Sequence, residues 1–367
     1  MNYTSKIGSG QLFLFVVLSR VIITLAYGIN AGGHTISNGA WFACLLLPIT
    51  LMVLGIPTLL FIQKAKGVSI CDFAFTVGKK TGYAVSILYA ILFFALSFSS
   101  VGRFSYFVTS TMQANQSIWF FPILMMAAVC FGAIKGLRAI FRAGAVLSIF
   151  CIAAILAIVI ALLPRFEFLN IINPFYHGAS QVGYSVIMLT FSSMEMGAFL
   201  MLAPLVNGKL TKTYVGYAVV SAFFLFVVFF TVMAVLGQYA TLQMFPFYGV
   251  AGVAQIGELS NLSALEAAVW MIGVFLKSAV YLHLCYDCLA FMIPKEYRSI
   301  AIVVLAVLGV FSAVYTSNSL VSSKASYALP VIIGFNVVFS VVLPVFLLIL
   351  GKNKRRKPHE TNALPAS

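Results

Sequence analysis

Residues 188–208 read MLTFSSMEMGAFLMLAPLVNG, a run long and apolar enough to cross a lipid bilayer, with Glu195 near its middle. A charge at the centre of a membrane helix costs about 2.5–3.5 kcal/mol, so such a side chain normally faces the interior of a helix bundle or water. Ser192 and Ser193 precede the glutamate, and Gly197 follows it. Small polar residues and glycine weaken a membrane helix where the freed backbone groups find other partners. The stretch therefore predicts a membrane helix that is broken beside Glu195.

The rest of the chain has the composition of an all-α polytopic membrane protein. Of its 367 residues, 62% are hydrophobic and 8% are charged, which leaves too few charged side chains to cover a soluble domain. Because about 20 apolar residues span the hydrocarbon core, the sequence predicts ten membrane helices. The ten segments are residues 11–30, 38–62, 83–109, 118–134, 143–163, 181–206, 213–238, 263–292, 299–316 and 327–350. They form one transmembrane domain, residues 1–351, and residues 352–367 form a basic tail.

The distribution of lysine and arginine predicts the orientation of these helices. If the N-terminus is cytoplasmic, 17 of the 22 basic residues lie on the cytoplasmic side, whereas Arg165 and Lys324 lie on the other side. The 17 residues are Lys6, Lys64, Lys66, Lys79, Lys80, Lys135, Arg138, Arg142, Lys209, Lys212, Lys295, Arg298, Lys352, Lys354, Arg355, Arg356 and Lys357. Since cytoplasmic loops favour positive residues, both termini are expected in the cytoplasm. The net charge of +14 then reflects topology and indicates no nucleic-acid partner, and the tail is expected to contact anionic lipids.

Arg20 and Lys277 lie at about the same membrane depth as Glu195. Arg20 follows Gln11 by nine residues, which places it about 14 Å into the membrane at 1.5 Å per residue. Lys277 stands in the middle of the eighth predicted helix. Three central charges on three helices favour a polar, functional interior, and charge pairs that only hold helices together are the alternative. Arg103, nearer the outer end of the third helix, suits either role.

Three other charged or titratable residues lie near the ends of the eighth predicted helix. Glu266 is close to its outer end, and His283 and Asp287 are close to its inner end. The last two are four residues apart and therefore share a helix face. We expect these residues to form structural pairs that hold helices together.

The helix count suggests an internal repeat. The ten segments divide into two sets of five, residues 11–163 and 181–350, and the two sets enter the membrane from opposite sides. Inverted repeats of this kind are typical of secondary transporters, in which discontinuous helices form a solute site near the middle of the membrane. The sequence therefore predicts a 5+5 inverted repeat with breaks in helices 1 and 6, the helices that carry Arg20 and Glu195.

Four stretches resemble the B subunits of spore nutrient-germinant receptors, which are endospore-germination permeases of the amino acid–polyamine–cation transporter superfamily. The stretches are QLFLFVVLSRVIITLAYG at 11–28, GAWFACLLLPITLMVLGIPTLLF at 39–61, MLTFSSMEMGAFLMLAPLVN at 188–207 and LSALEAAVWMIGVFLKSAVYL at 262–282. The resemblance covers nearly the whole chain. It implies the inner membrane of a bacterial spore, a small nutrient ligand such as an amino acid, and partner subunits of the A and C types.

The central charges and the predicted helix break suggest which residues form the ligand site. The residues expected to bind ligand are Arg20, Thr24, Arg103, Ser192, Ser193, Glu195 and Gly197. In related folds a sodium ion lies between helices 1 and 8, so the ammonium of Lys277 is expected to take its place, facing carbonyl or hydroxyl groups near Thr24. The sequence departs from the superfamily at Ile22 and Thr24, which stand where glycines of an unwound first helix are expected.

Three functions are compatible with these features. The first is a receptor subunit that binds a nutrient and signals to its partners, and the second is an autonomous amino-acid transporter coupled to protons or another cation. The third is a structural subunit whose pocket is vestigial. We expect no enzyme activity, metal or cofactor, because the chain carries no metal-ligand spacing, nucleophile elbow or phosphate-binding loop. Cys285 and Cys288 are three residues apart, but no second cysteine pair accompanies them.

Overall fold

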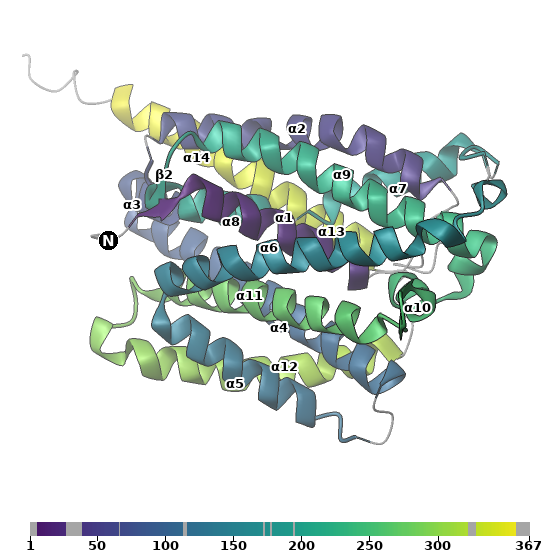
Figure 1. Cartoon of the computed structure of the whole chain (residues 1–367). Coiled ribbons are helices and arrows are strands. Elements are labelled where there is room, and N and C mark those ends of the chain that lie inside the picture. Colours follow the sequence, from purple (N-terminus) through teal and green to yellow (C-terminus); the bar gives the residue numbers. More distant parts are fainter. Residues whose placement is uncertain are drawn as a thin grey trace, which may run out of the picture.

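The computed structural model describes residues 6–26, 39–65, 67–112, 116–171, 173–176, 178–193, 195–321 and 328–356. The chain folds into a bundle of helices that lie side by side (Figure 1). Its α-helices are α1 (Ser9–Ala26), α2 (Ala40–Lys64), α3 (Ile70–Val77), α4 (Lys79–Thr111), α5 (Phe120–Lys135), α6 (Leu137–Leu162), α7 (Ala179–Phe191), α8 (Glu195–Leu202), α9 (Leu210–Leu236), α10 (Pro246–Val253), α11 (Ser263–Leu289), α12 (Arg298–Val321), α13 (Ala328–Val337) and α14 (Leu343–Arg356). A π-helical segment, Val338–Val342, joins the last two. Short 3-10 helices are Leu163–Arg165, Phe168–Asn170, Ala203–Leu205, Gly237–Leu242 and Lys295–Tyr297.

The prediction of a polytopic helical membrane fold is confirmed. Each of the ten predicted segments contains a helix, and the sixth and tenth are divided into α7 and α8 and into α13 and α14. Among the described residues, eight helices are long and apolar enough to cross a membrane, and Ser9–Ile22 and Phe120–Lys135 are shorter apolar helices. The eight are Ala40–Lys64, Lys79–Thr111, Leu137–Arg165, Ala179–Leu205, Leu210–Ala240, Ser263–Leu289, Arg298–Asn318 and Ile333–Gly351.

The predicted break in the first helix is not present between Ser9 and Ala26, where α1 is continuous. The physical reason lies in its sequence, because after Gly10 this segment contains neither glycine nor proline to interrupt the helical hydrogen bonds. Residues 27–38 of the predicted first helix and loop lie outside the described residues. In contrast, the sixth helix ends at Phe191 and resumes at Glu195, as predicted.

The fold is not purely α-helical, since four strands of two residues each accompany the helices in the described residues. Strand β1 (Ile7–Gly8) pairs in parallel with β2 (Val206–Asn207), and β3 (Gln255–Ile256) pairs antiparallel with β4 (Leu259–Ser260). Two residues are too few to show a strand periodicity in the sequence. The pairing of β1 with β2 places residues 7–8 beside the residues that follow the broken sixth helix.

The broken helix and α11 form the interior of the bundle. In their most apolar windows, 76% of residues 179–205 and 78% of α11 are buried, compared with 28% of α12. Ser97 of α4 and Ser278 of α11 exchange hydrogen bonds, since each hydroxyl donates to the other residue's carbonyl, at 3.0 and 3.1 Å. Gly273 of α11 faces Ile22 of α1, and a Cβ there would collide with the isoleucine. Close helix packing thus brings α1, α4 and α11 together around the sixth helix.

The two ends of the bundle differ in what they carry. Figure 1 shows the start of the chain, β2, α3 and the end of α14 at one end, and α10 at the other. The first residue described and the last therefore lie at the same end of the molecule. A chain that enters and leaves at one end crosses the bundle an even number of times.

Candidate functional site

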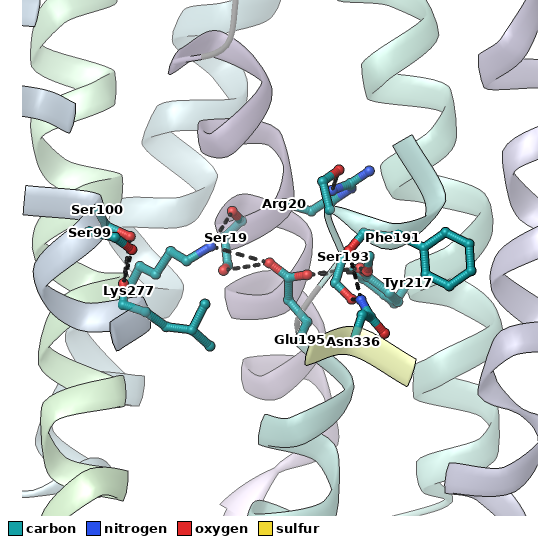
Figure 2. A network of polar contacts seen from close by, with 12 residues as sticks. Ser19, Arg20, Ser99, Ser100, Phe191, Ser193, Glu195, Tyr217, Lys277 and Asn336 are labelled. Carbon is teal, nitrogen blue, oxygen red and sulfur yellow. Dashed lines mark hydrogen bonds and ion pairs between the residues drawn. The ribbon is translucent and has the colours of Figure 1, made fainter. Parts of the chain in front are cut away.

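The break in the sixth helix is the centre of a buried polar network (Figure 2). The amide of Ser192 still donates to the carbonyl of Met188, and that of Ser193 donates to the carbonyl of Thr190. The hydroxyl of Ser192 folds back onto the carbonyl of Leu189 at 3.2 Å. Serine side chains compete in this way with the backbone ladder of a helix. The helix therefore ends at the serine pair, where the sequence predicted its break.

Glu195 is the first residue of α8 and is fully buried. Its carboxylate accepts hydrogen bonds from the hydroxyls of Ser19 (3.0 Å), Ser193 (3.2 Å) and Tyr217 (3.3 Å). It also forms an ion pair of 3.4 Å with the ammonium of Lys277. A carboxylate at a helix N-terminus is further stabilised by the partial positive charge there. A buried charge that costs energy in lipid is thus compensated on every side by neighbours in this chain.

Lys277 belongs to α11, its ammonium points toward α1, and the side chain is almost fully buried. Its ammonium is 3.4 Å from the carbonyl oxygen of Ser19 and 3.4 Å from Oε1 of Glu195. It also lies 5.6 Å from the centre of the Tyr281 ring. The ammonium therefore sits among a carbonyl, a carboxylate and an aromatic face, a mainly oxygen environment that would also suit a hard cation. The carbonyl belongs to Ser19, five residues before Thr24, near which the sequence placed the oxygen partners of Lys277.

Arg20 is fully buried and lies against the other half of the broken helix. Its guanidinium donates to the hydroxyl of Ser192 at 2.8 Å and to the carbonyl of Leu189. These groups are in the last turn of α7, where carbonyls lack helical partners and the helix carries partial negative charge. At the break, each half-helix thus meets a charge opposite in sign to its own end. The positive Arg20 lies at the C-terminus of α7, and the negative Glu195 lies at the N-terminus of α8.

The remaining predicted site residues, Gly197, Arg103 and Thr24, have no contact with Glu195 among those given above. Gly197 faces α4, and a Cβ on it would lie 3.2 Å from a methyl carbon of Leu92, so this glycine serves close helix packing. Arg103 is half buried on α4, and none of the hydrogen bonds or ion pairs of Glu195 given above involves it. The side chain of Thr24 lies outside what the structure describes.

Sequence reasoning missed three members of the network, namely Ser19, Tyr217 and Asn336. Asn336 donates from its amide nitrogen to the carbonyls of Phe191 (2.8 Å) and Ser193 (2.7 Å). An asparagine within an apolar membrane segment was a usable signal, since buried polar groups in lipid are expensive. Tyr217 gave no such signal, because tyrosines pack in many aromatic-rich helices.

The charges at the two ends of α11 are placed as follows. His283 lies 3.7 Å from Asp287, and its Nδ1 is 2.7 Å from the carbonyl of Ala133 on α5, which agrees with a structural role. Glu266 is buried, and its two carboxylate oxygens have no hydrogen-bond partner within the described part of the chain. The prediction that Glu266 forms a structural pair is therefore wrong within the described residues. The sequence predicted how deep Glu266 lies in the membrane, but it did not predict which side chains surround it.

A many-helix membrane bundle with a central broken helix and buried charges at the break has the architecture of secondary-transporter folds. A family model described as spore germination protein matches residues 6–321. The chain belongs to this spore germination family, as the sequence resemblance indicated. A search of curated proteins found no match.

The fold is similar to that of solved transporter structures, and two examples show this. The first is Mhp1, a nucleobase-cation-symport-1 family transporter in a closed conformation with bromovinylhydantoin bound. It is 13% identical, with a TM-score of 0.64 over 96% of this chain and 94% of that one. The second is the substrate-bound, outward-open state of a Na⁺-coupled sialic acid symporter. It is 11% identical, with a TM-score of 0.52 over 94% of this chain and 78% of that one. At such identities the similarity establishes the transporter fold.

Proposed function

We propose that this chain is the membrane-embedded B subunit of a spore germinant receptor in the inner membrane of a bacterial spore. It binds a small nutrient, of the amino-acid class, at the break in the sixth helix and signals germination together with A-type and C-type subunits. One observation carries the proposal: a chain of the spore germination family, with a transporter fold, buries Glu195 and its counter-ion Lys277 at a broken helix. The role includes no catalytic step.

The charges at the break suit an amino acid because the break offers both positive and negative groups, and an amino acid carries one of each. The ammonium of a ligand would compete with Lys277 for Glu195, and its carboxylate would accept hydrogen bonds from Arg20. Since Glu195, Lys277 and Arg20 lie on three different helices, an exchange of partners would alter how these helices pack. A ligand that interacts differently with two packing arrangements shifts the equilibrium between them, which is the physical basis of a signal.

We further propose that the fold is a ten-helix, 5+5 inverted repeat with both termini in the cytoplasm. In the described part of the chain, the eight long apolar helices together with the shorter α1 and α5 would supply ten crossings. This even number agrees with a chain whose described ends lie at one end of the bundle (Figure 1). The basic residues of the tail would then lie along anionic lipids of the inner leaflet.

This topology predicts the accessibility of introduced cysteines. Single cysteines in residues 110–117, 168–178 and 240–260 should react with a membrane-impermeant maleimide from outside. Those in residues 64–80, 135–142 and 207–212 should react only after the membrane is opened. Background labelling should be low, because five of the six native cysteines are buried and Cys130 is half buried. Reversal of any one loop would contradict the ten-helix arrangement.

The alternative function is an autonomous amino-acid transporter coupled to protons or another cation. It is supported by the two structural relatives, a nucleobase-cation-symport-1 family transporter and a Na⁺-coupled sialic acid symporter. Lys277 argues against a sodium-coupled version, since its ammonium lies beside oxygen atoms of Ser19 and Glu195 that would otherwise suit a cation.

Reconstitution separates the two functions. The purified chain, alone and with A-type and C-type subunits, would be placed in liposomes with a panel of radiolabelled amino acids. The receptor proposal predicts saturable binding that strengthens with the partner subunits, and no accumulation driven by a proton or sodium gradient. Gradient-driven uptake by the chain alone would establish the transporter instead.

A further inference from the structure

Asn336 joins the tenth helix to the break in the sixth. It lies in α13, is 2% exposed, and directs its amide nitrogen toward Phe191 and Ser193 (Figure 2). The carbonyls of these two residues belong to the interrupted part of the helix, where backbone acceptors lose their usual donors. An amide NH₂ group carries two donors, and both bonds are short, at 2.8 and 2.7 Å. A single side chain therefore satisfies two carbonyls that the break leaves exposed.

The tenth helix changes its winding directly after this residue, in the π-helical segment Val338–Val342. Pro344 follows that segment and has no backbone N–H. Pro344 therefore offers no donor to either of the carbonyls four and five residues before it, those of Ser340 and Phe339. Tyr89 of α4 donates its hydroxyl to Phe339 at 2.7 Å, and Thr58 of α2 donates to Ser340 at 3.0 Å. Side chains of two other helices thus supply hydrogen bonds to both carbonyls that face the missing N–H.

Beyond this segment the helix continues as α14 to the end of the bundle that carries α3 (Figure 1). There Gly351 lies against Phe73, and a Cβ on the glycine would be 3.0 Å from the phenylalanine ring. The tenth helix is therefore attached at three levels: to the break through Asn336, to α2 and α4 at the π-helical segment, and to α3 near its end.

We propose that Asn336 is a positioning residue that holds the sixth helix in its broken form, and that the tenth helix couples the break to the surface formed by α14 and α3. A shift of the break would move Asn336, and the tenth helix would pass that movement to α3. The inference goes beyond the proposed function and does not depend on which ligand is bound. Its test accordingly needs no ligand.

The decisive variant is Asn336→Leu, which keeps a similar volume and removes both donors. Hydrogen–deuterium exchange of the purified full-length protein in lipid nanodiscs would report on three segments: residues 188–200 at the break, 343–351 in α14, and 70–77 in α3. We expect exchange about tenfold faster in all three. A tenfold change corresponds to about 1.4 kcal/mol, within the range that two neutral hydrogen bonds contribute.

Ser340→Ala is the matched control, because Ser340 is also buried in the tenth helix and its contact with Thr58 uses the backbone carbonyl. It should exchange like wild type in all three segments. Unchanged exchange at the break in Asn336→Leu would overturn the positioning role, and faster exchange at the break alone would overturn the coupling to α3.

Thr58→Val keeps the test decisive if Asn336→Leu does not fold. Valine preserves the shape of threonine but removes the donor to the Ser340 carbonyl, four residues beyond Asn336 along the tenth helix. Faster exchange in residues 188–200 and 70–77 would support the coupling, whereas a change confined to residues 338–342 would overturn it.

Discussion

Replacing Glu195 with glutamine should shift the nutrient dose–response of spores by roughly tenfold to hundredfold. Glutamine keeps the size of the side chain and much of its hydrogen bonding but removes the charge. Loss of one charged hydrogen bond to a ligand costs on the order of 1.5–3 kcal/mol, which corresponds to that range. The measurement is a germination dose–response of spores that carry Glu195→Gln, with the protein level checked by immunoblot.

The ion pair in the structure adds an effect on stability. Glu195→Gln leaves the ammonium of Lys277 buried without its counter-charge, and breaking a buried pair on one side costs about 3–5 kcal/mol. The double variant Glu195→Gln/Lys277→Met removes both charges and should recover much of the stability, because a buried pair replaced as a whole is often neutral. We therefore expect normal protein levels for the double variant with a response that remains impaired.

Two outcomes would contradict this account. A normal dose–response of Glu195→Gln at a normal protein level would reduce Glu195 to a helix-packing residue. Recovery of a wild-type response by the double variant would show that the pair holds the helices together and takes no part in ligand recognition.

Replacing Lys277 with alanine should make the stability of the protein depend on sodium. The substitution removes the ammonium and leaves a space beside the Ser19 carbonyl and the Glu195 carboxylate, which lie 3.4 Å from Nζ in the wild type. Oxygen ligands in such a space suit a hard cation. We expect a loss of about 3–5 kcal/mol in sodium-free buffer, partly regained as sodium replaces N-methylglucamine at constant ionic strength.

Lys277→Met provides the control, since methionine fills much of the lysine volume and leaves little room for an ion. It should be destabilised to a similar degree and should not respond to sodium. Thermal unfolding of the purified variants in detergent measures both effects. If Lys277→Ala unfolds at the wild-type temperature without sodium, Lys277 does not stabilise the packing of α1 on α11, and its proposed place as an ion substitute is wrong.

The sequence by itself determined the class of protein, the position of its helices and the break beside Glu195. These features depend on local physics. An apolar run of membrane length forms a helix because its backbone groups have no other partners in lipid, and Ser192 and Ser193 end a helix because their hydroxyls compete for its carbonyls. The family could also be recognised from the sequence, because its motifs are contiguous stretches of residues.

Only the tertiary structure decided which charges meet. Arg20, Glu195 and Lys277 lie at similar depths, so depth did not distinguish Arg20 from Lys277 as the ion-pair partner of Glu195. The partner also depends on how each helix is rotated about its axis and on which helices touch, and packing between distant segments sets both. Glu195 and Lys277 are 82 residues apart, and Asn336 is 143 residues from Ser193. The depth of each charge in the membrane therefore follows from the sequence, whereas the direction of its side chain and its partner follow from the packing of the bundle.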